Sequence, residues 1–98
     1  MDQTQIIKNK MMRGQVLRTL TLFYPSPVTI GNLKSALITR GMTVTAEISK
    51  ILHYLQDKKY IKLREGAIKD IVDDDLIELT ALGIDLMEGT IEDAGVDI

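Results

Sequence analysis

Two short amphipathic segments, separated by a turn that contains glycine, constrain the fold of this chain most. The first begins after Thr29, a residue suited to capping a helix, and is followed by Gly41. The second runs from Thr45 to about Lys58 and repeats its apolar residues at helical spacing. Two short helices joined in this way form a helix-turn-helix. The sequence therefore predicts this unit over residues 29–58.

A longer helix is expected before this unit, over residues 3–24, where Gly14 is the only glycine and no proline occurs before Pro25. One face of this helix is expected to pack on the core. A second apolar face near the N-terminus predicts contact with another copy of the chain, because a monomer rarely leaves such a patch in water. Fraying or folding back of this end is the alternative. The residues of the predicted dimer interface are Ile6, Ile7 and Met11.

Two segments after the helix-turn-helix have the composition of strands. Residues 60–64 alternate apolar with basic side chains, and residues 76–80 are again rich in strand formers, which predicts a β-hairpin. Thr80 is placed to cap a last helix over residues 81–88, before Gly89. The acidic residues 90–98 are expected to form a loose tail. The predicted fold is thus mainly α with a small β-hairpin, in one domain over residues 1–89.

Composition excludes several classes of protein. The chain has 98 residues, enough for one hydrophobic core, and no cysteine, which removes disulfides and thiol chemistry and favours a reducing, cytoplasmic setting. No segment has the length and apolar character of a signal peptide or a membrane span. His53 is the only histidine, and the consecutive acids of residues 73–75 lack the spacing of a calcium loop. We therefore expect no enzyme activity, no metal and no cofactor.

The charges of the chain divide sharply at Arg64. Residues 1–64 hold eleven Lys and Arg against three acids, a formal charge of +8, whereas residues 65–98 hold one Lys against eleven acids, a charge of −10. A basic segment of this density suits a polyanionic partner. The alternative is that the two halves pair with each other within the molecule.

Two local motifs carry a resemblance to a known family. Residues 48–61, ISKILHYLQDKKYI, look like a recognition helix that runs into the first strand of a wing, and residues 79–89, LTALGIDLMEG, resemble the entry to a final helix. The order of elements and these motifs resemble the winged-helix DNA-binding regulators of bacteria, of the MarR and ArsR type. Across most of its length the chain also resembles small winged-helix proteins of Mu-like prophages. In such families a glycine usually stands where this chain has Lys59, which predicts either a left-handed backbone at Lys59 or a different turn.

The resemblance implies a dimeric transcriptional regulator that binds double-stranded DNA. The third helix would enter the major groove, with Lys50 contacting guanine or phosphate and basic residues elsewhere contacting phosphate. A wing carrying acids at residues 73–75 would be repelled by phosphate, so the helix is expected to carry recognition. A purely solvated helix face is the alternative reading. The predicted DNA-contact residues are Thr45, Ala46, Ser49, Lys50, His53, Arg40, Lys58, Lys62 and Arg64.

Two further hypotheses concern the acidic half of the chain. In the first, the domain is a protein-interaction module whose acidic wing and tail recruit a basic protein partner. In the second, the tail from Thr90 onward folds over the basic surface and weakens non-specific DNA binding. Both follow from the charge of residues 65–98.

Overall fold

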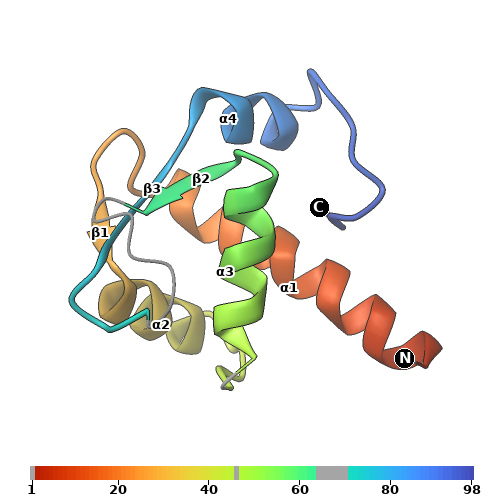
Figure 1. The fold of residues 1–98 in the computed structure, drawn as a ribbon, viewed down its shortest axis with the longest axis horizontal. Coiled ribbons are helices and arrows are strands. Elements are labelled where there is room, and N and C mark those ends of the chain that lie inside the picture. The colour runs from red at the N-terminus through yellow and green to blue at the C-terminus, as the bar shows by residue number, and fades with distance from the viewer. Residues whose placement is uncertain (1, 46, 64–70) are drawn as a thin grey trace.

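The computed structural model describes residues 2–45, 47–63 and 71–98. This part of the chain forms four helices and a small three-stranded antiparallel sheet (Figure 1). In chain order the elements are α1 (Gln3–Thr21), β1 (Val28–Thr29), α2 (Ile30–Thr39), α3 (Ile48–Asp57), β2 (Ile61–Leu63), β3 (Leu76–Leu79) and α4 (Ala81–Met87). The predicted class, mainly α with a small amount of β structure, is confirmed.

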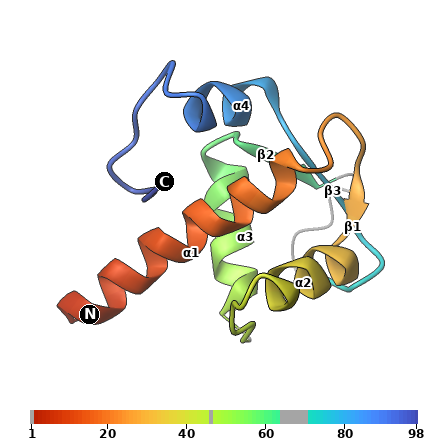
Figure 2. The ribbon, with the colours of Figure 1, turned by 180° about the vertical axis from the view of Figure 1, so that it is seen from behind.

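Aliphatic side chains from α1, α2, α3 and the sheet form one core. The apolar spacing of each helix explains its burial, since Val16, Leu17 and Leu20 share one face of α1 and Leu33 and Leu37 share one face of α2. All five of these side chains are buried. The N-terminal half of α1 extends beyond this core, as the two opposite views show (Figures 1 and 2).

The predicted hairpin is present, and a third strand joins it. β2 pairs antiparallel with β3, with Ile61 opposite Leu79 and Lys62 opposite Glu78. β1 pairs with the other edge of β3, so the strand order is β1-β3-β2. The sequence prediction missed β1 because a strand of two residues is too short to show the alternation that identifies a strand.

Two helix boundaries differ from the prediction by three residues. α1 ends at Thr21 rather than at residue 24, because the N–H groups of Leu22 and Phe23 donate to carbonyls three residues back, which tightens the last turn. α3 begins at Ile48 rather than at Thr45. The Thr45 hydroxyl accepts a hydrogen bond from the N–H of Glu47 (3.2 Å), so Thr45 belongs to the turn that leads into the helix.

The predicted caps are confirmed. The side chain of Thr29 accepts from the N–H of Asn32 at the start of α2, and Thr80 accepts from the N–H of Gly83 at the start of α4. Gly41 follows α2 with a φ of 88°, a left-handed conformation that costs glycine little. Lys59 follows α3 with a φ of 70°, which confirms the left-handed backbone expected at this position.

A Lys59→Gly variant is expected to be more stable than the wild type by about 1 kcal/mol, because glycine adopts this backbone without the steric cost that a side chain carries. Urea unfolding followed by circular dichroism measures the change. Lys59→Ala is the matched control, since it removes the same charge but keeps a side chain at a φ of 70°. If both variants gain equally, charge rather than backbone conformation is responsible.

The C-terminal segment is packed against the domain, so the expectation of a loose tail is wrong. Val96 is buried, and the N–H of Asp97 donates to the carbonyl of Lys10 on α1 (3.0 Å). The tail passes over Gly14, where a side chain would collide with the Asp97 carbonyl. Because Gly14 has no side chain, the tail can pack directly on the middle of α1.

Candidate nucleic-acid interface

The face of α3 opposite the core contains the central part of the predicted DNA-contact set. Ile48, Ile51, Leu52 and Leu55 are buried, so helical geometry turns residues 50, 53 and 57 outward. Lys50 and Asp57 are exposed, and His53 is half-buried. A basic side chain, a hydrogen-bonding ring and an acidic side chain thus share the outward stripe, which spans about 10 Å at the rise of an α-helix.

The side chain of Lys50 is largely exposed to solvent. Its ammonium lies 3.2 Å from the carboxylate of Glu47, and 82% of its side chain is accessible. An ion pair this exposed is weak, because water and salt screen it. Lys50 can therefore exchange Glu47 for a phosphate or a base edge at little cost.

Thr45 and Ser49 lie toward α2. Both line a pocket of about 440 Å³ whose wall is largely apolar and includes Ile30, Ile38 and Ile48. Thr45 is exposed and Ser49 is half-buried. Their hydroxyls therefore border the groove between α2 and α3 and flank the outward stripe.

The remaining predicted DNA contacts are more widely spread. Arg40 is exposed at the end of α2, and Lys62 is exposed on β2, directly opposite Glu78. Ala46 and Arg64 lie outside the described residues. The structure thus groups Thr45, Ser49, Lys50 and His53 around the first half of α3.

Lys58, at the end of α3, is engaged by the tail. Its ammonium lies 3.0 Å from the carboxylate of Asp93, whose side chain is only 10% accessible. The same carboxylate accepts a hydrogen bond from the Tyr60 hydroxyl (2.6 Å). Among the predicted DNA contacts that the structure describes, Lys58 is the one that forms an ion pair with the tail, so its charge is already partly neutralised.

Sequence reasoning missed the other residues that hold the tail. The Arg13 guanidinium lies over the Tyr54 ring, 3.7 Å from its centroid, and donates to the carbonyl of Gly95 (3.0 Å). Gly95 in turn sits against the Tyr54 hydroxyl, where a side chain would collide. We call Arg13, Tyr54, Lys58, Tyr60 and Asp93 the tail clasp. Its only sequence signal is a pair of tyrosines near two bases, which is too common to identify such a contact.

The tail clasp shifts the pKa values of Asp93 and Tyr60 in opposite directions. The hydrogen bond from Tyr60, helped by the Gly95 N–H and by Lys58, lowers the pKa of Asp93 to about 2. Burial, together with the hydrogen bond to Asp93, raises the pKa of Tyr60 to about 12. Both groups therefore hold one charge state across the physiological range, with Asp93 ionised and Tyr60 neutral.

Lowering the pH is expected to destabilise the folded chain, because the Asp93 carboxylate becomes protonated. Because its pKa is lower in the folded chain than in the unfolded chain, its contribution to stability is present above about pH 4 and is lost as the pH falls toward 2. An Asp93→Asn variant should be less stable than the wild type at pH 7, and this difference should shrink between pH 4 and pH 2. Urea unfolding at pH 7, 4, 3 and 2 measures it. A difference independent of pH would contradict the assigned role of the carboxylate.

The acids of residues 73–75 lie against the start of α2, and Asp73 and Asp74 are exposed to solvent. The carbonyls of Asp73 and Asp75 accept from the first N–H groups of α2, those of Gly31 and Ile30 (both 2.9 Å). The Asp73 carboxylate forms an ion pair with Lys34 (2.7 Å). These contacts fasten the segment to the start of α2, where negative charge is favourable.

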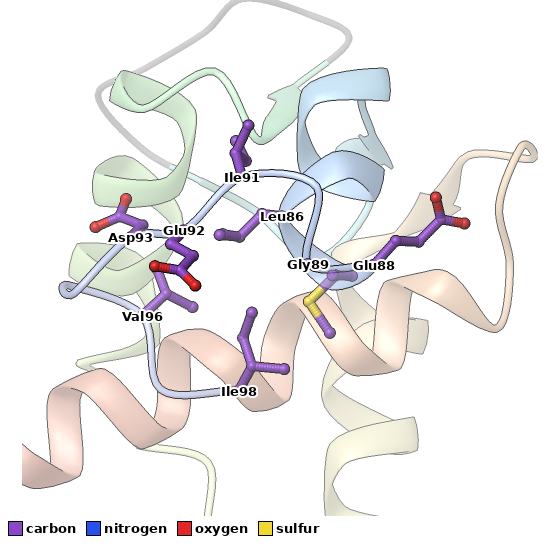
Figure 3. A pocket seen from close by; sticks show the side chains of 9 residues that line it. Leu86, Glu88, Gly89, Ile91, Glu92, Asp93, Val96 and Ile98 are labelled. Carbon is purple, nitrogen blue, oxygen red and sulfur yellow. The ribbon is translucent and has the colours of Figure 1, made fainter.

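A second pocket, of about 340 Å³, lies between α4 and the tail (Figure 3). Its apolar lining comes from Leu86, Ile91, Val96 and Ile98 among others, and Glu88, Glu92 and Asp93 border it.

Of the predicted dimer residues, Ile7 and Met11 are about half exposed on α1, whereas Ile6 is partly covered.

Within residues 2–45, 47–63 and 71–98, no group of three or more His, Asp and Glu side chains is arranged to hold a metal ion. None of the helices described is both long enough and apolar enough to cross a membrane.

Comparison of the chain with protein-family models, with curated proteins and with solved structures finds no match.

Proposed function

We propose that this chain is a winged-helix regulator of transcription, which binds double-stranded DNA as a dimer and inserts α3 into the major groove. The observation that carries the proposal is the outward face of α3, where Lys50 and His53 point away from the core and Lys50 forms an exposed ion pair with Glu47. A helix of this length fits the major groove, and such side chains can reach base edges.

Several contacts support the wider arrangement. A short helix, a turn through Gly41 and a second helix are followed by an antiparallel pair of strands, which is the order of a helix-turn-helix with a wing. The acids of residues 73–75, which would repel phosphate from a projecting wing, are bound to α2 and partly neutralised by Lys34. Arg40 and Lys62 would contribute sequence-independent phosphate contacts.

Selection from a random duplex library, at two salt concentrations, tests this function. Lys50→Ala should bind about tenfold more weakly, select an altered sequence and show a salt dependence smaller by about one phosphate contact. Glu47→Gln is the matched control, because it frees Lys50 from its ion pair and removes a negative charge; it should bind as tightly as the wild type or more tightly. A folded chain that binds no duplex at low salt would contradict the proposal.

A second candidate function is a non-catalytic protein-interaction module that recruits a basic partner. It is favoured by the acidic C-terminal part, where Glu88, Glu92 and Asp97 are exposed and no Lys or Arg occurs between residues 71 and 98. Failure to bind DNA, with capture of a basic protein that Glu88→Lys abolishes, would support this function.

A further inference from the structure

The ion pair of Lys50 with Glu47 differs from the ion pairs that tie the fold together. Its two residues are only three positions apart at the start of α3, and 82% and 59% of their side chains are accessible. A pair this exposed adds little to stability. Two other ion pairs join segments that are far apart in the chain, namely Lys34–Asp73 and Lys58–Asp93. The Lys50–Glu47 pair has no comparable role in holding the fold.

The carboxylate of Glu47 is not used to cap α3. Glu47 is the N-cap residue, a position from which a side chain often accepts from the first N–H groups of the helix, yet its side chain accepts no such bond from α3. It reaches forward to Lys50 instead, with 3.2 Å between the Glu47 Oε2 and the Lys50 Nζ. The carboxylate therefore lies beside the ammonium at the outward face of α3.

A carboxylate at this place opposes DNA binding unless a base donates to it. Phosphates repel the negative charge, and guanine and thymine expose only acceptors in the major groove. The donors there are the N4 amino group of cytosine and the N6 amino group of adenine. Adenine N6 lies next to N7, an acceptor that repels a carboxylate, whereas cytosine has no acceptor on this edge. Glu47 therefore favours cytosine over the other bases.

A G·C base pair is the chemical complement of this ion pair. Guanine exposes the acceptors O6 and N7, which suit the ammonium of Lys50, and cytosine exposes the N4 donor, which suits the carboxylate of Glu47. Guanine O6 and cytosine N4 are hydrogen-bonded to each other, so they lie about 2.9 Å apart. The Lys50 Nζ and the Glu47 Oε2 are separated by a similar distance, 3.2 Å. The two side chains can therefore contact both bases of one pair without separating.

We propose that Lys50 and Glu47 together recognise one G·C base pair, with the Lys50 ammonium on guanine and the Glu47 carboxylate on the N4 amino group of cytosine. The reversed pair is rejected, because it places the ammonium against a donor and the carboxylate against two acceptors. This inference rests on the proposed DNA binding and deepens it, because it names one base pair of the site and adds Glu47 as a residue that determines specificity.

Alanine variants test whether both side chains contact the same base pair. Fluorescence anisotropy at fixed salt compares a duplex from the library selection with duplexes changed at single base pairs. The wild type should prefer G·C at the assigned pair by about tenfold or more. Lys50→Ala and Glu47→Ala should each lose most of this preference at that same pair and keep the preferences elsewhere in the site. Circular dichroism verifies that both variants are folded.

Glu47→Gln separates the base contact from a simple effect of charge. Glutamine keeps an acceptor for cytosine N4 and also suits N6 and N7 of adenine, so this variant should keep its affinity but accept adenine in place of cytosine. Glu88→Gln is the matched control, since it removes one exposed acidic charge at the opposite end of the molecule from the start of α3 (Figure 1). It should keep every preference of the wild type.

Exchange of the two charges gives a second test. A variant with Glu47→Lys and Lys50→Glu keeps the net charge but reverses the ion pair. It should therefore select guanine on the strand where the wild type selects cytosine.

Three results would overturn the inference: alanine variants that change different base pairs, a Glu47→Ala variant that keeps every preference of the wild type, and a charge exchange that leaves the selected pair unchanged. Each of these would leave DNA binding by α3 standing. A folded wild type that binds no duplex at low salt would instead contradict the proposed function, and this inference with it.

Discussion

A Gly83→Ala variant is expected to lose about 2–3 kcal/mol of unfolding free energy, although alanine is ordinarily the better helix former. Gly83 lies in the first turn of α4, where a Cβ would collide with the Tyr60 carbonyl and lie 2.6 Å from Cδ1 of Leu79. The Tyr60 carbonyl is held in place because it accepts from the N–H of Thr80 (3.0 Å). Helix α4 must therefore move away from the junction of α3 and β2.

Urea unfolding followed by circular dichroism measures this loss. Gly31→Ala is the matched control, because a Cβ on Gly31 would meet its nearest atoms, in Asp73, at 3.4 Å, an ordinary contact. That variant should keep the stability of the wild type or exceed it. Equal stability of the two variants would show that α4 does not approach Tyr60 as closely as described.

A Gly14→Ala variant is expected to release the tail and to destabilise the chain by about 2 kcal/mol, against the gain of about 1 kcal/mol that this substitution usually brings to a helix. The new Cβ would collide with the Asp97 carbonyl oxygen and lie 2.8 Å from its carbon. The hydrogen bond from the Asp97 N–H to Lys10 should break, and Val96 should become exposed.

Hydrogen exchange of the Asp97 amide reports this release directly. In the wild type the amide should be protected, and in Gly14→Ala it should exchange at the rate of an unfolded chain. Gly31→Ala again serves as the control and should leave the Asp97 amide protected. A more stable Gly14→Ala variant with a protected Asp97 amide would contradict the close packing of the tail on α1.

Local sequence signals predicted the helices and the hairpin well. Thr29 and Thr80 are caps whose hydrogen bonds involve neighbours only three residues away, so the sequence contains all the information they need. The left-handed backbone at Lys59 was one of the two outcomes that the family resemblance implied, because a glycine usually stands at this position. Helices α2 and α3 and the β2–β3 pairing follow from the spacing of apolar residues over short distances.

Contacts between distant residues were not predicted. The tail clasp joins Arg13 to Gly95 and Tyr60 to Asp93, separations of 82 and 33 residues, and no local pattern reveals such partners. For the same reason, Lys58 was expected to be a phosphate contact, whereas the structure pairs it with Asp93. The fixed position of the acids of residues 73–75 likewise depends on α2, forty residues earlier.

Mapping the DNA-binding face by nuclear magnetic resonance tests the central claim most directly. A ¹⁵N-labelled chain is titrated at low salt with a duplex taken from the library selection, and its backbone amide shifts are followed. The account predicts that the largest shifts fall on the turn at Thr45 and the first half of α3, around Ser49, Lys50 and His53, with smaller shifts at Arg40. Absence of shifts, or shifts confined to α4 and the tail, would contradict DNA recognition by α3.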